Sequence, residues 1–196
     1  EKHPDRLAIT CDPHELTYRE LNELVDKIAR AFLERGVQAN DRVAYLLPNS
    51  IELVAVYLAI QKIGAVAVPL NYRLIAREIA YLTNAVAAKL LVFDQRFLDK
   101  VEESLNDFNA RIDLMEVGAS TSFAPRLFDL AEAAPLYNVE VFHNRSALSR
   151  IQFTGGSTGL PKGACRTHLA DLTEIDAVAQ SSGFCEVIHP VVLIQC

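Results

Sequence analysis

The stretch from Ile151 to His168 reads Ile-Gln-Phe-Thr-Gly-Gly-Ser-Thr-Gly-Leu-Pro-Lys-Gly-Ala-Cys-Arg-Thr-His. Its apolar start predicts the end of a strand, and the residues after it are small or carry hydroxyls. Glycines let backbone N–H groups approach an anion closely, and consecutive N–H groups form an anion-binding concavity. We therefore predict a loop that binds phosphate groups. Its predicted binding residues are Thr154, Gly155, Gly156, Ser157, Thr158, Gly159 and Lys162.

The position of the lysine separates this loop from the common phosphate loop of nucleoside triphosphatases. That loop has a glycine, four residues, and then Gly-Lys-Ser/Thr at the start of a helix. Here Lys162 follows Pro161 and precedes Gly163, so the template does not match. A plain surface loop is the simpler alternative, but such loops rarely place Pro-Lys-Gly behind a run of glycine, serine and threonine.

The string from Phe153 to Gly163, followed by Thr167 and His168, resembles the signature loop of the adenylate-forming superfamily. This superfamily comprises acyl-CoA synthetases, firefly-luciferase-like enzymes and the adenylation domains of peptide synthetases. The resemblance extends over nearly the whole chain, through residues 16–21, 41–50 and 62–74. The run Asn71-Tyr72-Arg73-Leu74 is closer to acyl-CoA synthetases than to adenylation domains. We interpret it as structural and assign it no chemistry.

The resemblance implies a fold and a reaction. The fold would be α/β, with a mostly parallel sheet flanked by helices, as the first part of the family's large N-terminal domain. In the family, a carboxylate attacks the α-phosphate of Mg-ATP and gives an acyl-adenylate and pyrophosphate. A thiol, usually that of coenzyme A, then displaces AMP. The resemblance therefore implies ATP, Mg²⁺ and coenzyme A as cofactors, and a fatty or other carboxylic acid as substrate.

The loop of this family holds the β- and γ-phosphates as they become the leaving group. The Lys162 ammonium and the hydroxyls of Thr154, Ser157 and Thr158 would neutralise and orient charge on pyrophosphate, and glycine N–H groups would add dipoles. The rest of the family's site has no counterpart here. The adenine- and Mg-binding segment, the ribose-binding aspartate, the hinge and the catalytic lysine are absent, so no catalytic residue is assigned.

Two observations predict a fragment of a longer protein. The only methionine is Met115, and the chain stops inside an apolar run. We expect the N-terminal part of an acid–CoA ligase, inactive by itself. Two alternatives stay open: an acyl-AMP ligase that delivers its product to a carrier protein, and a non-catalytic truncated module of the same fold. A truncated sheet also leaves an unpaired edge and apolar surface, which predicts a homodimer or a larger assembly.

Composition and charge limit the class of partner. The 196 residues are 51% hydrophobic and 22% charged, as in globular proteins. A net charge of −6 argues against nucleic acid and against an anionic membrane surface. From residue 141 to 170 the chain nevertheless has four cations and no acid, which suits a polyphosphate ligand: Arg145, Arg150, Lys162 and Arg166.

Cysteine usage and apolar runs predict the compartment. Cys11, Cys165, Cys185 and Cys196 show no framework spacing, and no uncharged apolar run reaches the roughly 18 residues that span a bilayer. We expect free thiols, a cytoplasmic location and no transmembrane segment. Cys185 and His189 have a ligand-like gap, but no second pair completes a metal site, so we predict none.

Strands and helices alternate at a spacing of roughly 20–25 residues, which predicts a parallel sheet with helices on both faces. Strands are expected at 7–10, 42–47, 66–68, 90–93, 111–117, 151–153 and 187–194. Helices are expected between Thr17 and Gly36, and at 51–63, 77–84, 95–105, 127–133 and 168–181. We divide the chain into a first α/β subdomain, 1–140, and the start of a second subdomain with the phosphate loop, 141–196.

Overall fold

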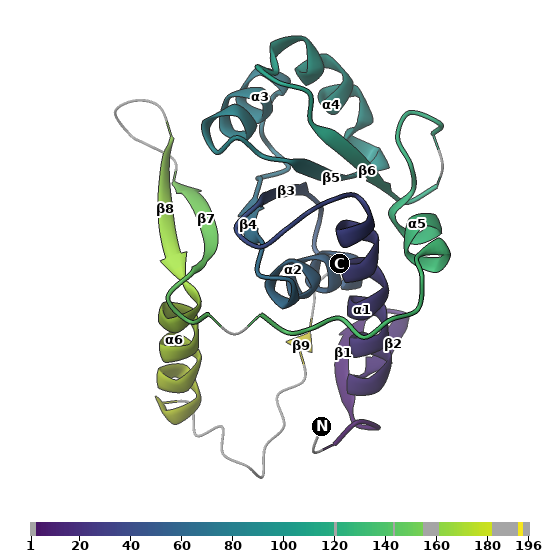
Figure 1. Cartoon of the computed structure of the whole chain (residues 1–196), viewed down its shortest axis with the longest axis vertical. Coiled ribbons are helices and arrows are strands. Elements are labelled where there is room, and N and C mark those ends of the chain that lie inside the picture. Colours follow the sequence, from purple (N-terminus) through teal and green to yellow (C-terminus); the bar gives the residue numbers. More distant parts are fainter. Residues whose placement is uncertain (1–2, 120, 143, 155–160, 182–191, 194–196) are drawn as a thin grey trace.

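A six-stranded sheet lies at the centre of the computed structural model, which describes residues 3–119, 121–142, 144–154, 161–181 and 192–193 (Figure 1). Its strands are β3 (Arg42–Leu46), β4 (Val66–Pro69), β5 (Leu90–Asp94), β6 (Asp113–Val117), β7 (Leu148–Thr154) and β8 (Lys162–Thr167). They lie in the order β6-β5-β3-β4-β7-β8. Neighbours are parallel except β7 and β8, which are antiparallel. This confirms the predicted, mostly parallel α/β sheet.

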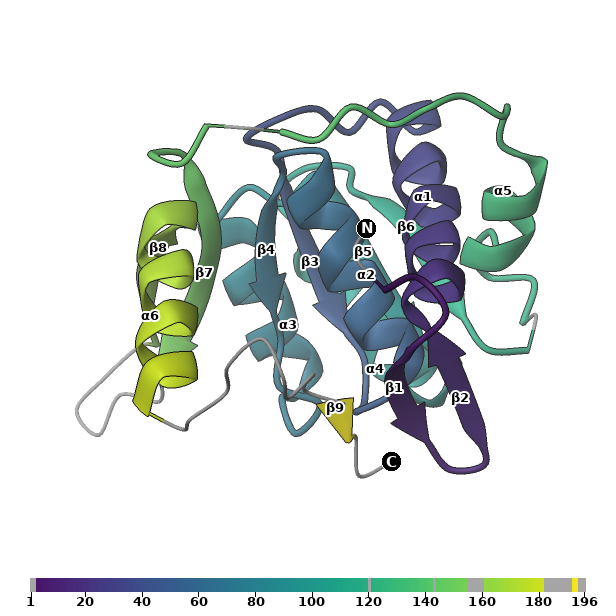
Figure 2. The ribbon, with the colours of Figure 1, turned by 90° about the horizontal axis from the view of Figure 1, so that it is seen from below.

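Helices cover both faces of the sheet, as predicted. One face carries α1 (Tyr18–Glu34), α2 (Ile51–Lys62) and α5 (Leu127–Ala133), and the other carries α3 (Ala76–Ala85) and α4 (Leu98–Ser104). Single 3₁₀ turns at Gln95–Phe97 and Leu105–Asp107 flank α4. Figure 2 shows α1 and α2 lying over the same side of the strands.

Burial on both faces explains the apolar sequence of the central strands. In β3, Val43 and Tyr45 pack into the core under α1 and α2, whereas Ala44 and Leu46 pack against α3 and β5 in the opposite core. A strand with a water-facing side would alternate apolar and polar residues. Residues 42–46 do not alternate because neither side of β3 reaches water.

Two predicted N-caps fix the starts of helices. The Thr17 hydroxyl accepts a hydrogen bond from the Glu20 N–H at 3.3 Å, and the Glu20 carboxylate accepts one from the Thr17 N–H at 2.8 Å. These bonds lower the pKa of the Glu20 carboxyl, the backbone bond most strongly. At the start of α2, the Ser50 hydroxyl accepts a hydrogen bond from the Leu53 N–H at 3.1 Å. Both contacts satisfy N–H groups that have no partner within the helix.

A second, small sheet lies beside the first. It consists of β2 (His14–Thr17), β1 (Leu7–Cys11) and β9 (Val192–Leu193), with β1 and β2 antiparallel. The sequence does not predict β2, and the rest of the strand expected at 187–194 lies outside the described residues. Cys11 is disulfide-bonded, so the expectation of free thiols is wrong at this position, whereas Cys165 is free and exposed.

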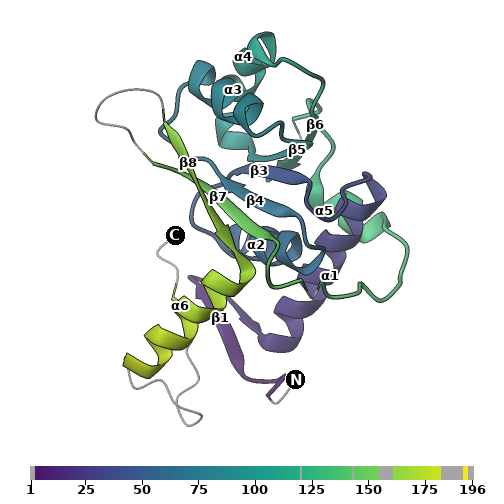
Figure 3. The same cartoon turned by 60° about the vertical axis from the view of Figure 1, so that its left-hand side comes forward.

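The hairpin of β7 and β8 continues directly into α6 (His168–Ser181), which projects away from the sheet (Figure 3). The helix is predicted with these bounds, but β8 is not predicted. Within the described part of the chain, the large apolar side chains of α6 are between 43% and 62% exposed: Leu169, Leu172, Ile175 and Val178. Apolar burial therefore contributes little to the attachment of α6.

The segment that leads into the hairpin follows the end of α2. The Phe142 N–H donates to the Lys62 carbonyl at 2.9 Å, and the Phe142 ring lies over Gly64. Gly64 has φ of +72°, and a Cβ there would stand 2.3 Å from the ring, so only glycine fits. The predicted boundary near residue 140 falls in this segment. The division into 1–140 and 141–196 stays a prediction, although β7 and β8 extend the sheet formed by β3–β6.

Candidate phosphate-loop site

The two ends of the predicted phosphate loop lie opposite each other. Thr154 ends β7, Lys162 begins β8, and the two are paired in the antiparallel ladder. The Thr154 hydroxyl donates a hydrogen bond to the Lys162 carbonyl at 3.3 Å. The other five predicted phosphate-binding residues lie outside the described residues: Gly155, Gly156, Ser157, Thr158 and Gly159. The structure therefore places the base of the loop, between two paired strands.

A cleft of about 410 Å³ opens beside the base of the loop. It lies at the carboxyl ends of the parallel strands β4 and β7 and is lined by residues of three segments: 69–74, 152–154 and Pro161, with Leu82 of α3. In open α/β sheets, ligands bind at the carboxyl ends of the strands. The position of the cleft is thus the expected one for a ligand held by the loop.

The run from Asn71 to Leu74 contributes to the wall of this cleft, a role that the sequence analysis missed. The Asn71 side-chain oxygen accepts a hydrogen bond from the Arg73 N–H at 2.9 Å, which fixes a tight turn after β4. The Tyr72 ring stacks on Phe97 at a centroid distance of 6.3 Å, and the Lys100 ammonium donates to the Tyr72 carbonyl at 2.9 Å. The position of the run directly after a buried strand was the signal that could have revealed it.

Gly163 allows β8 to pass close to the side chains of β7. A Cβ at Gly163 would stand 3.0 Å from Cγ2 of Ile151 and 3.4 Å from Cε1 of Phe153. Both side chains pack against the core beneath α3 and α4, so neither can move away freely. The glycine after the lysine therefore has a packing role at the base of the loop, in addition to its place in the signature.

The cations around the loop divide into two groups. Lys162 is exposed and makes no ion pair with any described residue. In contrast, Arg150 and Arg166 form ion pairs with Asp171 and Glu174 of α6. The expectation that all four cations serve a polyphosphate is wrong for these two arginines. The acid-free stretch ends at residue 170, and α6 brings the next two acids back onto the hairpin.

His168 begins α6 on the far side of the hairpin from the loop. Its ring lies 5.9 Å from the ring of Phe142, and its Nε2 is buried without a hydrogen-bond partner among the described residues. Burial lowers the pKa of His168, and the negative charge of Asp171 partly opposes this shift. The structure thus agrees with a helix-start and packing role for His168.

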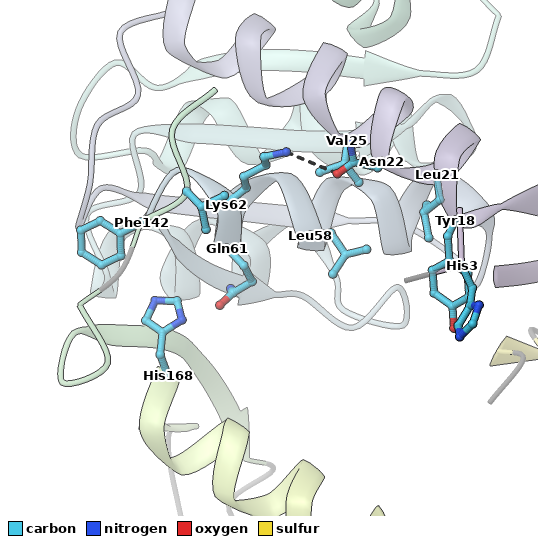
Figure 4. Close-up of a pocket in the computed structure, with 11 residues that line it drawn as sticks. His3, Tyr18, Leu21, Asn22, Val25, Leu58, Gln61, Lys62, Phe142 and His168 are labelled. Carbon is cyan, nitrogen blue, oxygen red and sulfur yellow. Dashed lines mark hydrogen bonds between the residues drawn. The ribbon is translucent and has the colours of Figure 1, made fainter. Parts of the chain in front are cut away.

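A larger groove, of about 730 Å³, lies elsewhere, between α1, α2 and the segment at Phe142 (Figure 4). His168 and Gln61 line one end, and the Lys62 ammonium donates to the Asn22 side chain at 3.4 Å along its wall. The seven predicted phosphate-binding residues are not among the lining residues. Size alone therefore does not identify the candidate site.

The described residues contain no group of three or more His, Cys, Asp or Glu side chains that could hold a metal ion. In the same part of the chain, the helices are too short or too polar to cross a bilayer. The candidate site consequently rests on the loop and its neighbouring cleft.

Comparison with known proteins agrees with this site. A family model described as "AMP-binding enzyme" matches residues 1–193. A medium/long-chain-fatty-acid–CoA/3-oxocholest-4-en-26-oate–CoA ligase of Mycobacterium tuberculosis is 31% identical over 173 residues, covering 84% of this chain and 31% of that protein. A 3-hydroxybenzoate–CoA/4-hydroxybenzoate–CoA ligase of Thauera aromatica is 33% identical over 168 residues, covering 84% and 32%. A linear gramicidin synthase of Brevibacillus parabrevis is 31% identical over 185 residues, covering 92% and 3%.

Solved structures show the same fold. A structure described as a long-chain-fatty-acid CoA ligase from Rhodopseudomonas palustris superposes with a TM-score of 0.81 at 28% identity, covering 91% of this chain and 44% of that one. The chain spans about a third of the length of the CoA ligases that it matches in sequence. Because the family model covers nearly all of the chain, the chain belongs to the AMP-binding enzymes of the adenylate-forming superfamily, as an N-terminal portion of their fold.

Proposed function

We propose that the chain is part of an ATP-dependent acid–CoA ligase. In the first step, a carboxylate oxygen would attack the α-phosphorus of ATP, the bond to the pyrophosphate oxygen would break, and an acyl-adenylate would form. In the second step, the thiolate of coenzyme A would attack the acyl carbon, and AMP would leave with the bonding electrons. The residues of this chain would act in the first step, on the departing pyrophosphate.

The observation that supports this role most strongly is the position of Lys162. Its ammonium stands at the mouth of the loop without an ion-pair partner in the described structure, opposite the Thr154 hydroxyl. A cation without a carboxylate partner retains its full charge for an anionic ligand. Donors that are already in place where charge develops stabilise a transition state without reorganisation. Thr154 and Lys162, with the loop between them, would hold the β- and γ-phosphates in this way.

The acceptor and the acid are proposed from relatives. Two relatives named as CoA ligases support coenzyme A, and their names include both fatty acids and hydroxybenzoates. We propose a fatty or other carboxylic acid as substrate. The similarity to the linear gramicidin synthase, which is not named as a CoA ligase, keeps an acyl-AMP ligase with a carrier-protein acceptor as the second candidate. A non-catalytic module of the same fold is the third.

Mg²⁺ would accompany ATP and neutralise phosphate charge. The described residues offer no carboxylate set that fits the ion, so no step is assigned to it. A cytoplasmic location stays a prediction. We further propose that the 196-residue chain alone is inactive, because the family's adenine-binding segment and catalytic lysine have no counterpart in its sequence.

ATP–pyrophosphate exchange tests this proposal. A full-length ligase that contains the chain should exchange labelled pyrophosphate into ATP only when a carboxylic acid is present, and the 196-residue chain alone should not. Acyl-CoA should form when coenzyme A is added. Exchange without acyl-CoA formation would favour the carrier-protein candidate, and absence of exchange with every acid tested would favour the non-catalytic module.

A further inference from the structure

The hairpin that carries the loop is weakly attached to the central sheet. Among the described residues, β7 pairs with β4 at one position only, Ala67 with Arg150. Strand β8 pairs with β7 alone, and most of its residues are exposed. The spacing between the two ends of the loop therefore depends on contacts within the hairpin and on what holds it at its other end.

Two arginines face each other at that other end. Arg150 of β7 and Arg166 of β8 are directly paired in the antiparallel ladder, and both side chains are more than half buried. Like charges placed opposite each other on paired strands are destabilising. Without neutralisation, this pair would separate β7 from β8 four residues from Thr154.

Asp171 of α6 neutralises this pair. Its Oδ1 accepts a hydrogen bond from Nε of Arg166 at 2.8 Å and lies 3.3 Å from a terminal nitrogen of Arg150. Its Oδ2 accepts a hydrogen bond from the hydroxyl of Ser149, which is fully buried where the ladder of β7 is irregular. The Asp171 side chain is only 15% exposed. One carboxylate thus joins three side chains from both strands.

Other contacts hold Asp171 itself in place. The backbone of α6 begins with hydrogen bonds from the His168 N–H to the Ala147 carbonyl at 3.1 Å and from the Leu169 N–H to the Arg145 carbonyl at 2.8 Å. On the opposite side, the Gln61 amide of α2 donates to the Ser149 carbonyl at 3.0 Å. Since the apolar side chains of α6 are exposed, this polar network is its main contact with the hairpin.

We propose that Asp171 is a positioning residue for the phosphate loop, because it neutralises Arg150 and Arg166 and so keeps Thr154 and Lys162 paired. This inference rests on the proposed function for its catalytic consequence, but its structural part does not. Glu174 assists through the same arginines from a more exposed position.

Hydrogen exchange on the 196-residue chain tests the structural part. Asp171→Asn preserves the size of the side chain and removes its charge. It should raise amide exchange in β7 and β8 about tenfold, as expected for local opening, and leave β5 unchanged. Asp176→Asn is the matched control, since Asp176 lies on the same helix and makes no ion pair within the described part of the chain; it should have no effect.

A second substitution separates charge neutralisation from simple loss of packing. Arg166→Leu in the Asp171→Asn background removes one of the facing cations, so it should restore protection of β7. Unchanged exchange in Asp171→Asn, equal exchange gains in β5, or no rescue by Arg166→Leu would each overturn the proposal. If Asp171→Asn does not fold, recovery of a folded chain in the double variant supports the proposal and its absence contradicts it.

Kinetics of a full-length ligase test the catalytic consequence. Asp171→Asn should raise the KM for ATP in pyrophosphate exchange by about tenfold, because the loop ends are no longer held in register, and leave the KM for the acid unchanged. Equal KM values for ATP in the variant and the wild type would remove this role. An inactive wild-type protein would instead count against the proposed function, and hydrogen exchange would still decide the role of Asp171.

Discussion

Thr154 and Lys162 lie opposite each other on antiparallel strands, and the Thr154 hydroxyl donates to the Lys162 carbonyl at 3.3 Å. The loop between them is therefore closed at its base by strand pairing. A loop with paired ends loses less conformational entropy when it orders around a ligand than one with free ends. The pairing of these two residues connects the fold to the proposed chemistry.

Gly163→Val should destabilise the base of the loop. The new side chain would meet Ile151 and Phe153, whose positions the core restricts, so we expect a loss of about 1–3 kcal/mol in the free energy of unfolding. Urea denaturation measures it. Ala164→Val, at the next and exposed position of β8, is the control and should change stability by less than about 0.5 kcal/mol. Equal effects of the two changes would contradict the packing role of Gly163.

Ser50→Ala should destabilise the buried helix α2. The hydroxyl of Ser50 satisfies the Leu53 N–H, and loss of an N-cap typically costs about 1 kcal/mol. Thermal or urea denaturation gives the change in unfolding free energy. Ser50→Asp keeps an acceptor at the same place and should retain most of the stability. A fully stable Ser50→Ala variant would show that the cap is not needed.

His168 should make the stability of the chain depend on pH. Burial lowers its pKa below the ordinary value of 6.5, so below about pH 6.5 the unfolded state binds more protons than the folded state. The free energy of unfolding should then fall as the pH is lowered from 7.5 to 5.5. His168→Leu should reduce this slope, measured by urea denaturation at both pH values. An identical slope in the variant and the wild type would exclude His168 as its source.

The chain should self-associate through exposed apolar surface. Leu172 and Ile175 of α6 are 43% and 62% exposed, and β8 is the last strand of its sheet among the described residues. Ile175→Glu should shift the assembly toward monomer, as measured by light scattering over a range of protein concentrations. A wild-type chain that stays monomeric at every concentration would contradict the predicted homodimer.

The sequence predicts those parts of the fold that local signals determine. Thr17 and Ser50 mark helix starts through side chains that act within three residues, and the apolar runs of β3–β5 show burial on both faces. In contrast, β8 has the sequence Lys-Gly-Ala-Cys-Arg-Thr, which neither alternates nor contains large apolar residues. It is a strand because β7 pairs with it, and that pairing is not a property of its own sequence.

The candidate site shows the same division. The signature of the loop identifies the family from its order of residues alone, and the position of Lys162 excludes the common nucleotide loop. The ion pairs of Arg150 and Arg166 could not be predicted, because they depend on how α6 folds back on the hairpin. The role of residues 71–74 in the cleft likewise depends on the neighbouring strand β7.

Lys162→Ala in a full-length ligase tests the central claim most directly, with acid-dependent ATP–pyrophosphate exchange as the measurement. Lys27→Ala, which removes an exposed lysine paired with Glu132 far from the loop, is the matched control. If Lys162 holds the departing pyrophosphate, its loss should lower the exchange rate by about a hundredfold or more, with little change in unfolding free energy. A wild-type exchange rate in the Lys162→Ala variant would contradict the account.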